Sequence, residues 1–378
     1  MYEEAFMNAF SILFSESYKD SNIRDLSKER TLASMPYGCR YRLIDFILSS
    51  LVNSQIYSVG ILTKNNYGSL IDHLREGKDW DMDRKNDRLR ILTPFVQDAN
   101  MAYSNSKIEA LLSVRNYLES MQKEYCILAD CNVIFNIDFD DVIECHERKN
   151  ADITIVYRSA KEVTDAMAIE CDLGGKVTGT RFVARNSAKY NDISMNIYVL
   201  KKDLLLKILD SSISYGFHDL EREIIARNVN TMNIFAYKHI GYSSVINSVA
   251  GYYKANMELL DRNIRTELFS SDTTILTKIM NMTPTIYQRN CKMKNTLVGD
   301  GAVIDGHVEN SIIFRGVKIQ KGAYVKDSII MQDTVIGQNA IVENAICDKS
   351  VKICDGAEIK GTKKYPFVIR KNEIIEKD

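Results

Sequence analysis

Two hydrophobic patterns divide the chain near residue 280. Before that point, short apolar runs typical of buried strands alternate with stretches in which apolar residues recur at helical spacing. The apolar runs lie at residues 57–63, 125–130, 151–158 and 195–200, and the clearest helical stretch covers residues 41–54. This alternation predicts an α/β domain with a mostly parallel sheet covered by helices, in which ligands bind at the carboxyl ends of the strands.

The last part of the chain repeats itself every 17 residues. The segments ENSIIF, KDSIIM and ENAICD begin at Glu309, Lys326 and Glu343, and each repeat contains three short apolar steps. Glycine, asparagine and aspartate recur among these steps and suit the tight corners between them. Hexapeptide-type repeats of this kind predict a parallel β-helix over about residues 292–359. Its open end exposes strand edges, which favours capping by another domain or subunit.

The two patterns imply two domains. A stretch without helical periodicity, which includes Pro284, marks a linker at residues 281–290. We therefore expect an α/β domain over residues 1–280, and a linker followed by the β-helix domain over residues 281–378. A chain of 378 residues with 45% hydrophobic residues is sufficient to form two cores.

Composition and charge argue against some classes of binding partner. The formal net charge is −1 and charges of both signs are mixed along the chain, so neither nucleic acid nor a membrane surface is an expected partner. The longest early apolar stretch is too short to span a bilayer, which predicts a cytoplasmic protein. The eight cysteines and five histidines show no metal-ligand spacing and no disulfide framework.

Two stretches carry a family resemblance. MPYGCRYRLIDFILSSLVNS at residues 35–54 and FRGVKIQKGAYVKDSIIMQDTVIG at residues 314–337, in this order, resemble the ADP-glucose pyrophosphorylase family. The active members of this family are glucose-1-phosphate adenylyltransferases of bacterial glycogen synthesis. The resemblance covers nearly the whole chain and implies a nucleotidyltransferase-like α/β domain, a left-handed β-helix used in oligomer contacts, and a tetramer.

Several parts of the family's mechanism are missing from this sequence. The active members need a glycine-rich loop, cationic side chains and Mg²⁺ held by carboxylates, because charge develops on phosphate oxygens that are already surrounded by negative charge. The resemblance places the Gly-Gly-x-Gly-x-Arg loop at residues 15–22 and an adenine-contacting motif at residues 105–110, and neither segment contains a glycine. It places an activation-linked lysine at Leu32 and the glutamate that orients glucose at Ala184.

The resemblance also locates the two metal-binding aspartates. Counting forward from Leu128 places Cys131 at the first aspartate, while Asp130 lies one residue earlier and, in a strand, points to the opposite face. A shift of one residue would instead make Asp130 the ligand, so it is kept as a candidate catalytic residue. The second aspartate falls on Val245, whose side chain has no ligand atom. We therefore expect no metal site, and Mg²⁺ as a cofactor only if the chain is an active enzyme.

Four residues are candidates for binding anions. The resemblance places Arg185 at the lysine that meets the sugar phosphate, and Ser194 at the serine of a Ser-Met-Gly-Ile-Tyr motif in which Asn196 replaces the glycine. Arg40 and Arg42 lie at the start of the predicted helix, in a segment that faces phosphates or effectors in relatives, which makes them candidates for an anion or effector site. Ion pairs with surface carboxylates are the alternative role for these two arginines.

The missing parts match the GlgD-type subunits of this family, which also lack the loop. We expect a non-catalytic or weakly catalytic regulatory subunit of glycogen biosynthesis. It would bind a homologous catalytic ADP-glucose pyrophosphorylase subunit, in a homo- or hetero-tetramer, and enhance its synthesis of ADP-glucose from ATP and glucose 1-phosphate. Two alternatives stay open: an active glucose-1-phosphate adenylyltransferase that uses Asp130, and a sugar-phosphate or effector-binding sensor that uses Arg185 and Ser194.

Overall fold

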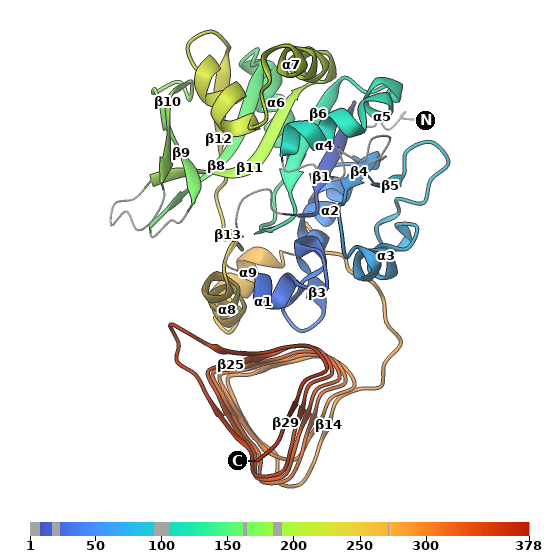
Figure 1. Cartoon of the computed structure of the whole chain (residues 1–378), viewed down its shortest axis with the longest axis vertical. Helices are drawn as coiled ribbons and strands as arrows, with labels where there is room; N and C mark the ends of the chain where they lie inside the picture. The colour runs from blue at the N-terminus through green and yellow to red at the C-terminus, as the bar shows by residue number, and fades with distance from the viewer. Residues whose placement is uncertain are drawn as a thin grey trace.

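The computed structural model describes residues 8–16, 23–93, 106–161, 165–183, 191–270 and 272–377. An α/β part packs against a triangular β-helix, and the helices α1, α8 and α9 lie on the side of the α/β part that faces the β-helix (Figure 1). These helices are α1 (Arg24–Ser27), α8 (Val249–Glu258) and α9 (Arg262–Leu268).

A nine-stranded sheet forms the centre of the α/β part. Its main path runs β10-β9-β11-β6-β1-β4-β5, and β8 pairs with both β11 and β12. The strands are β1 (Ala9–Phe14), β4 (Val59–Leu62), β5 (Leu89–Leu92), β6 (Tyr125–Asp130), β8 (Ile153–Ala160), β9 (Ala166–Cys171), β10 (Val177–Val183), β11 (Asn191–Lys201) and β12 (Ile234–Lys238). The four predicted strands are confirmed as β4, β6, β8 and part of β11. The core β6-β1-β4-β5 is parallel as predicted, whereas β11 runs antiparallel to β6 and β8.

Helices cover both faces of this sheet. One face packs against α2, α3 and α6, and the other packs against α4, α5, α7 and the π-helical turn η4. Their bounds are α2 (Leu43–Asn53), α3 (Gly68–Leu74), α4 (Lys107–Ser113), α5 (Arg115–Ser120), α6 (Phe139–Arg148), α7 (Lys202–Tyr215) and η4 (Leu220–Ile225). The helix predicted at residues 41–54 is α2, and its apolar side buries Ile44, Ile47 and Leu51. None of the helices in the described ranges is long and apolar enough to cross a membrane.

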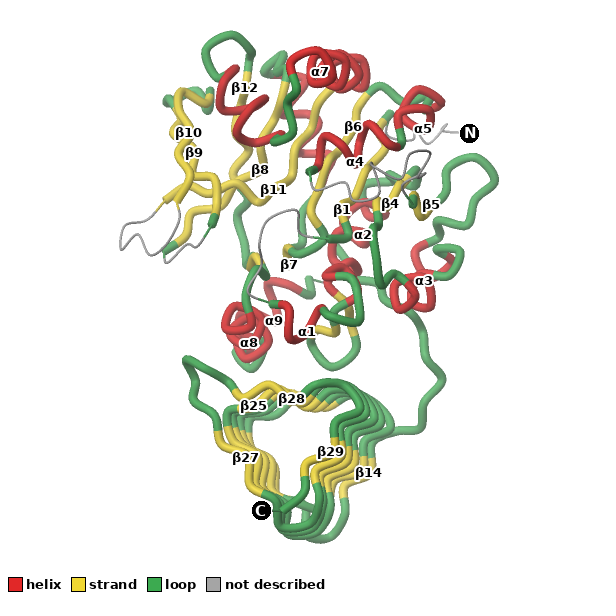
Figure 2. Tube along the Cα trace, in the orientation of Figure 1, coloured by secondary structure: helices red, strands yellow, loops and turns green. Residues whose placement is uncertain are grey.

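The β-helix stacks short strands into three parallel sheets (Figure 2). The 17-residue repeat is confirmed, because Val308, Val325 and Val342 are successive partners in the ladder and each is 17 residues from the next. The corners between strands are residues with left-handed backbone such as Asn310, Asp327 and Asn344, as the polar spacing predicts. The coil begins at Ile286 and ends at Ile375, so it is longer than the predicted residues 292–359.

The three sheets of the β-helix are built as follows. The first sheet is β14 (Ile286–Tyr287), β17 (Val303–Ile304), β20 (Lys318–Ile319), β23 (Val335–Ile336), β26 (Lys352–Ile353) and β29 (Ile374–Ile375). The second is β15 (Lys292–Lys294), β18 (His307–Glu309), β21 (Tyr324–Lys326), β24 (Ile341–Glu343) and β27 (Glu358–Lys360). The third is β16 (Leu297–Val298), β19 (Ile312–Ile313), β22 (Ile329–Ile330), β25 (Ala345–Cys347) and β28 (Phe367–Ile369). Flanking coils differ in length, which is why the period is clear only in the middle of the β-helix.

A shared core joins the two parts. Phe314 and Met331 of the β-helix pack in one hydrophobic cluster with Leu32 and Tyr252 of the α/β part. Leu32 lies in the short helix η1 (Leu32–Ser34) and is buried in this cluster. The position that the resemblance assigns to an activation-linked lysine is therefore an apolar contact between the two parts.

Candidate functional site

The carboxyl ends of β1 and β6 meet at one edge of the sheet, where the fold predicts a ligand cleft. Directly after β6, the backbone amide of Cys131 donates to the carbonyl of Phe14 at 3.1 Å. Val245 lies beside this edge, because β13 (Ser244–Val245) pairs with β7 (Val133–Ile134) and sets Val245 opposite Val133. The two positions that the resemblance assigns to metal-binding aspartates are thus close in the fold.

Neither of these two side chains suits a cation. Cys131 is 1% exposed within the core, and burial first, then the charge of Asp130, raises the pKa of its thiol well above the usual range. A buried neutral thiol is a poor metal ligand. Val245 packs against the same core cluster. No group of three or more histidine, cysteine, aspartate or glutamate side chains that could hold a metal ion occurs in the described part of the chain.

Asp130 points to the opposite face from Cys131, as the alternation of a strand predicts. Its carboxylate lies 2.8 Å from the ammonium of Lys107, which also contacts the carboxylate of Glu221 at 2.7 Å. Burial by itself would lower the pKa of Lys107, but the two carboxylates outweigh it and hold the pKa above the usual range. Lys107 is therefore a fixed cation, and these residues do not fit Mg²⁺, since the carboxylate pair already shares an ammonium.

Ser194 belongs to the same buried network. β11 bulges between Ser194 and Ile197, and Asn196 within the bulge has a left-handed φ of 56°. Glycine and asparagine adopt this left-handed conformation more readily than other residues, which explains why asparagine can replace the glycine of the Ser-Met-Gly-Ile-Tyr motif at position 196. The Ser194 hydroxyl accepts from the Asn196 amide at 3.1 Å and lies 3.4 Å from the Tyr198 hydroxyl, which reaches Glu221 at 3.4 Å. The network brings together Ser194 and Asp130, whereas Arg185 lies outside the described residues, as do Ala184 and residues 17–22 of the predicted loop.

A polar pocket opens beside Ser194. Ser194, Asn196 and Val245 line it together with charged side chains of both signs, which are Arg158, Lys161, Asp165, Lys254 and Glu258. The positive and negative side chains of this pocket largely offset one another. The pocket is therefore suited to a polar ligand and has no strong preference for an anion.

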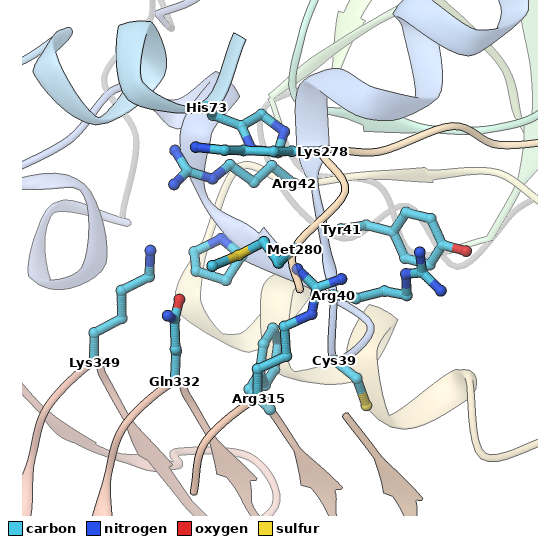
Figure 3. A pocket seen from close by; sticks show the side chains of 12 residues that line it. Cys39, Arg40, Tyr41, Arg42, His73, Lys278, Met280, Arg315, Gln332 and Lys349 are labelled. Atoms are coloured by element: carbon cyan, nitrogen blue, oxygen red, sulfur yellow. The ribbon is translucent and has the colours of Figure 1, made fainter. Parts of the chain in front are cut away.

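A second pocket lies between the α/β part and the β-helix, and it contains Arg40 and Arg42 (Figure 3). Arg315, Gln332 and Lys349 extend into it from the β-helix, toward Arg42 and Lys278 on the opposite side. Neither Arg40 nor Arg42 forms an ion pair with a carboxylate within the described ranges. Arg42 instead donates to the Ser69 hydroxyl at 2.9 Å.

The pocket is cationic, and burial lowers the pKa of several of its basic side chains. Burial and then the charge of Arg40 lower the pKa of Arg315, and burial lowers the pKa of Arg42 to about 10. Burial, reinforced by Arg42 and Arg30, lowers the pKa of Lys349 to about 7. Burial is the largest cause of each shift, and neighbouring positive charges add to it. An anion bound here would offset those charges, which is the arrangement expected of an anion site.

Sequence reasoning found only part of both sites. Lys107 and Glu221 were missed because their pairing joins residues 114 positions apart. The residues that the β-helix contributes to the cationic pocket could have been found from the sequence. Arg315, Gln332 and Lys349 are spaced by the 17-residue period and therefore lie on successive coils. Combining that period with Arg40 and Arg42 would have predicted the pocket.

Comparison with known proteins identifies the family. Residues 20–261 match the nucleotidyl transferase family, and residues 281–365 match the GlmU-like C-terminal hexapeptide family. The chain is 31% identical over 363 residues to the glycogen biosynthesis protein GlgD of Bacillus subtilis (strain 168), a match that spans 95% of each protein. It is 34% identical over 357 residues to GlgD of Geobacillus stearothermophilus, across 93% of each. It is 28% identical over 366 residues to glucose-1-phosphate adenylyltransferase of Clostridium perfringens (strain SM101 / Type A), across 94% of each. The chain belongs to the nucleotidyl transferase family, within the group that contains the ADP-glucose pyrophosphorylases and the GlgD-type glycogen biosynthesis proteins.

Proposed function

We propose that this chain acts in glycogen biosynthesis as a catalytically silent or weak subunit. Its partner would be a homologous glucose-1-phosphate adenylyltransferase, which makes ADP-glucose from ATP and glucose 1-phosphate. The chain would bind this partner as a subunit of a tetramer and raise its output by favouring its active conformation.

One observation carries the proposal. A buried thiol at Cys131 and an apolar side chain at Val245 occupy neighbouring positions at the edge of the cleft. Adenylyl transfer to a sugar phosphate requires charge stabilisation on the leaving pyrophosphate, and a carboxylate-bound divalent cation supplies it in this chemistry. A chain without ligands at both positions keeps the architecture of the enzyme but lacks the groups that accelerate the reaction.

The test is an assay of pyrophosphate release. The purified chain is given ATP, Mg²⁺ and glucose 1-phosphate, alone and mixed with a catalytic homologue. We expect negligible release by the chain alone, release above that of the homologue when the two are mixed, and co-elution of the two on size exclusion. The control mixes the homologue with heat-unfolded chain.

Two results would overturn the proposal. Rapid turnover by the chain alone would show that it is an enzyme in its own right, with Asp130 as the first residue to substitute. Mixing that gives neither higher release nor co-elution would exclude the partner role.

A second function is favoured by the cationic pocket: binding of an anionic effector. Arg42 and Lys278 face Arg315 and Lys349 across the junction of the two parts. An effector that bridges both sides would stabilise their relative position and so transmit its binding to the subunit contacts.

Titration calorimetry with a sugar bisphosphate and with inorganic pyrophosphate tests this second function. Arg315→Gln and Arg42→Gln are expected to weaken binding at least tenfold. The exposed β-helix lysine Lys321, which does not line the pocket, supplies the matched control as Lys321→Gln. Equal weakening by all three variants would indicate a general charge effect and no specific site.

A further inference from the structure

The ammonium of Lys107 lies between two carboxylates at the carboxyl end of β6. It contacts Asp130 at 2.8 Å and Glu221 at 2.7 Å, and the exposed fractions of the three side chains are 5%, 13% and 3% in that order. The three residues come from separate elements, because Lys107 begins α4, Asp130 ends β6 and Glu221 lies in η4. One charge therefore links three elements of the α/β part.

The rest of the surroundings hold the ammonium in place. Its nitrogen lies 5.2 Å from the centre of the Phe14 ring and 5.9 Å from that of Tyr198, so two aromatic faces contribute to its stabilisation. Without a cation, two carboxylates would be left close together and largely removed from water, which is costly. Two carboxylates around one cation is also an arrangement by which proteins bind Mg²⁺ or Mn²⁺.

We propose that Lys107 is a built-in substitute for a divalent cation. Its ammonium occupies the position between Asp130 and Glu221, so it offsets one of the two negative charges and holds α4, β6 and η4 together without metal. Asp130 is then a structural partner of Lys107 and not a metal ligand. This inference deepens the proposed function and rests on it for the identity of the cleft, but it concerns cation dependence and not turnover.

The test replaces the ammonium with an added metal. Lys107→Ala removes the charge and leaves a space beside both carboxylates, while Lys107→Ala combined with Asp130→Asn removes one of the two ligands as well. We expect the thermal midpoint of the native chain to be unchanged by millimolar Mn²⁺. The midpoint of Lys107→Ala should fall by several degrees and recover with Mn²⁺, and the double variant should show no recovery.

Other outcomes would contradict the proposal. A midpoint of Lys107→Ala equal to that of the native chain would show that the ammonium is not needed. A fall without recovery in Mn²⁺, or equal recovery in the double variant, would show that the position does not suit a metal. None of these measurements uses turnover, so an active native chain would overturn the proposed function and leave this test intact.

A second variant keeps the proposal testable if Lys107→Ala does not fold. Asp130→Asn is nearly isosteric and leaves Lys107 paired with Glu221. Bound Mn²⁺ is measured by electron paramagnetic resonance in this variant and in the native chain. Equal binding in the two is expected, since Asp130 is not a ligand. Loss of a bound Mn²⁺ in Asp130→Asn would show that the native cleft uses Asp130 to hold metal, and would overturn the proposal.

Discussion

At the scale of single residues, Lys349 is the side chain most sensitive to pH in the cationic pocket. Burial, followed by the charges of Arg42 and Arg30, lowers its pKa to about 7, and Asp348 only partly opposes this shift. His73 also lines the pocket, but burial lowers its pKa below the usual 6.5 despite its contact with Asp45. Around pH 7, the charge of the pocket therefore changes mainly through Lys349.

The lowered pKa of Lys349 predicts that anions bind the cationic pocket more tightly as the pH falls through about 7. A bound anion favours the charged form of Lys349 and raises its pKa, so binding takes up a proton wherever the free lysine is neutral. We expect sulfate, whose own charge is constant in this range, to bind about tenfold more tightly at about pH 6 than at about pH 8. Calorimetry in two buffers of different ionisation enthalpy measures the proton uptake. The Lys349→Met chain should bind more weakly and lose the pH dependence, and an unchanged pH dependence in this variant would assign it to another group.

Leu32 supports a second prediction at this scale. Its side chain is 3% exposed in the core shared by the two parts. Leu32→Lys, which restores the residue type that the resemblance implies, should destabilise the chain by more than about 3 kcal/mol because it buries an ammonium among apolar side chains. Leu32→Met, which nearly conserves volume, should cost less than about 1.5 kcal/mol. Chemical denaturation measures both, and equal stability of the two variants would show that position 32 can reach solvent.

Some of the residues discussed above could be assigned from the sequence, and others could not. Cys131 and Leu32 could be assigned by counting along a motif, because local register determines which residue occupies a given position. Lys107 and Glu221 could not, since only the folded sheet brings α4 and η4 to the end of β6. A lysine at the start of an amphipathic helix is usually solvated, so its sequence context indicated nothing unusual.

At the scale of elements, one face of the β-helix carries an alternating ladder of charge. Five residues in equivalent positions of successive coils are paired in register, and they are Lys294, Glu309, Lys326, Glu343 and Lys360. Each of the three inner charges therefore has opposite charges above and below it. A slip by one coil would set like charges opposite each other, so the ladder favours the observed register.

The ladder predicts the effect of a charge reversal. Glu343→Lys places three lysines in consecutive coils and should lower stability by about 1 kcal/mol at low ionic strength. Glu343→Gln removes the attraction without adding repulsion and should cost about half as much. The difference should nearly vanish in about 1 M NaCl, where screening acts within about 3 Å. A loss that does not respond to salt would attribute the effect to packing.

A second prediction at this scale concerns the loop at residues 15–22. Grafting the family's glycine-rich loop there supplies backbone amides for phosphates but no metal ligands. The graft is therefore expected to stay inactive in pyrophosphate release while Val245 and Cys131 are unchanged. Measurable adenylyl transfer by the graft alone would show that the metal-binding positions lie elsewhere in the cleft.

The coils of the β-helix could be predicted from the sequence more fully than the strand directions of the α/β part. The β-helix repeats a local rule in which apolar steps alternate with corner residues, so its coils and their register follow from the period. The antiparallel direction of β11 does not follow from alternation of strands and helices, because β9 and β10 intervene as a hairpin and the described residues between β8 and β11 contain no helix. The bulge at Asn196 likewise depends on neighbours on both sides of β11.

At the scale of the whole molecule, a buried ion pair fixes the β-helix to the α/β part. One guanidinium nitrogen of Arg30 contacts both oxygens of Asp348, at 2.8 and 2.7 Å, and both side chains are about 5% exposed or less. The Tyr253 hydroxyl also donates to the backbone carbonyl of Asp327 in the β-helix at 2.6 Å. Asp348 directly precedes Lys349, so the joint and the cationic pocket share one coil.

Loss of the Arg30–Asp348 ion pair should allow the β-helix and the α/β part to unfold separately. While the ion pair is intact, we expect the two parts to unfold as one unit. Asp348→Asn leaves the buried Arg30 without its counter-charge, and we expect a loss of about 3–5 kcal/mol. Replacing both partners, as Arg30→Met with Asp348→Leu, should recover much of that loss, because it leaves neither buried charge without a counter-charge. Calorimetry should record one transition for the native chain and the double variant, and a broadened or split transition for Asp348→Asn. A single sharp transition in Asp348→Asn, with little loss of stability, would show that the apolar contacts alone hold the β-helix in place, and the pocket would then owe its shape to packing and not to the ion pair.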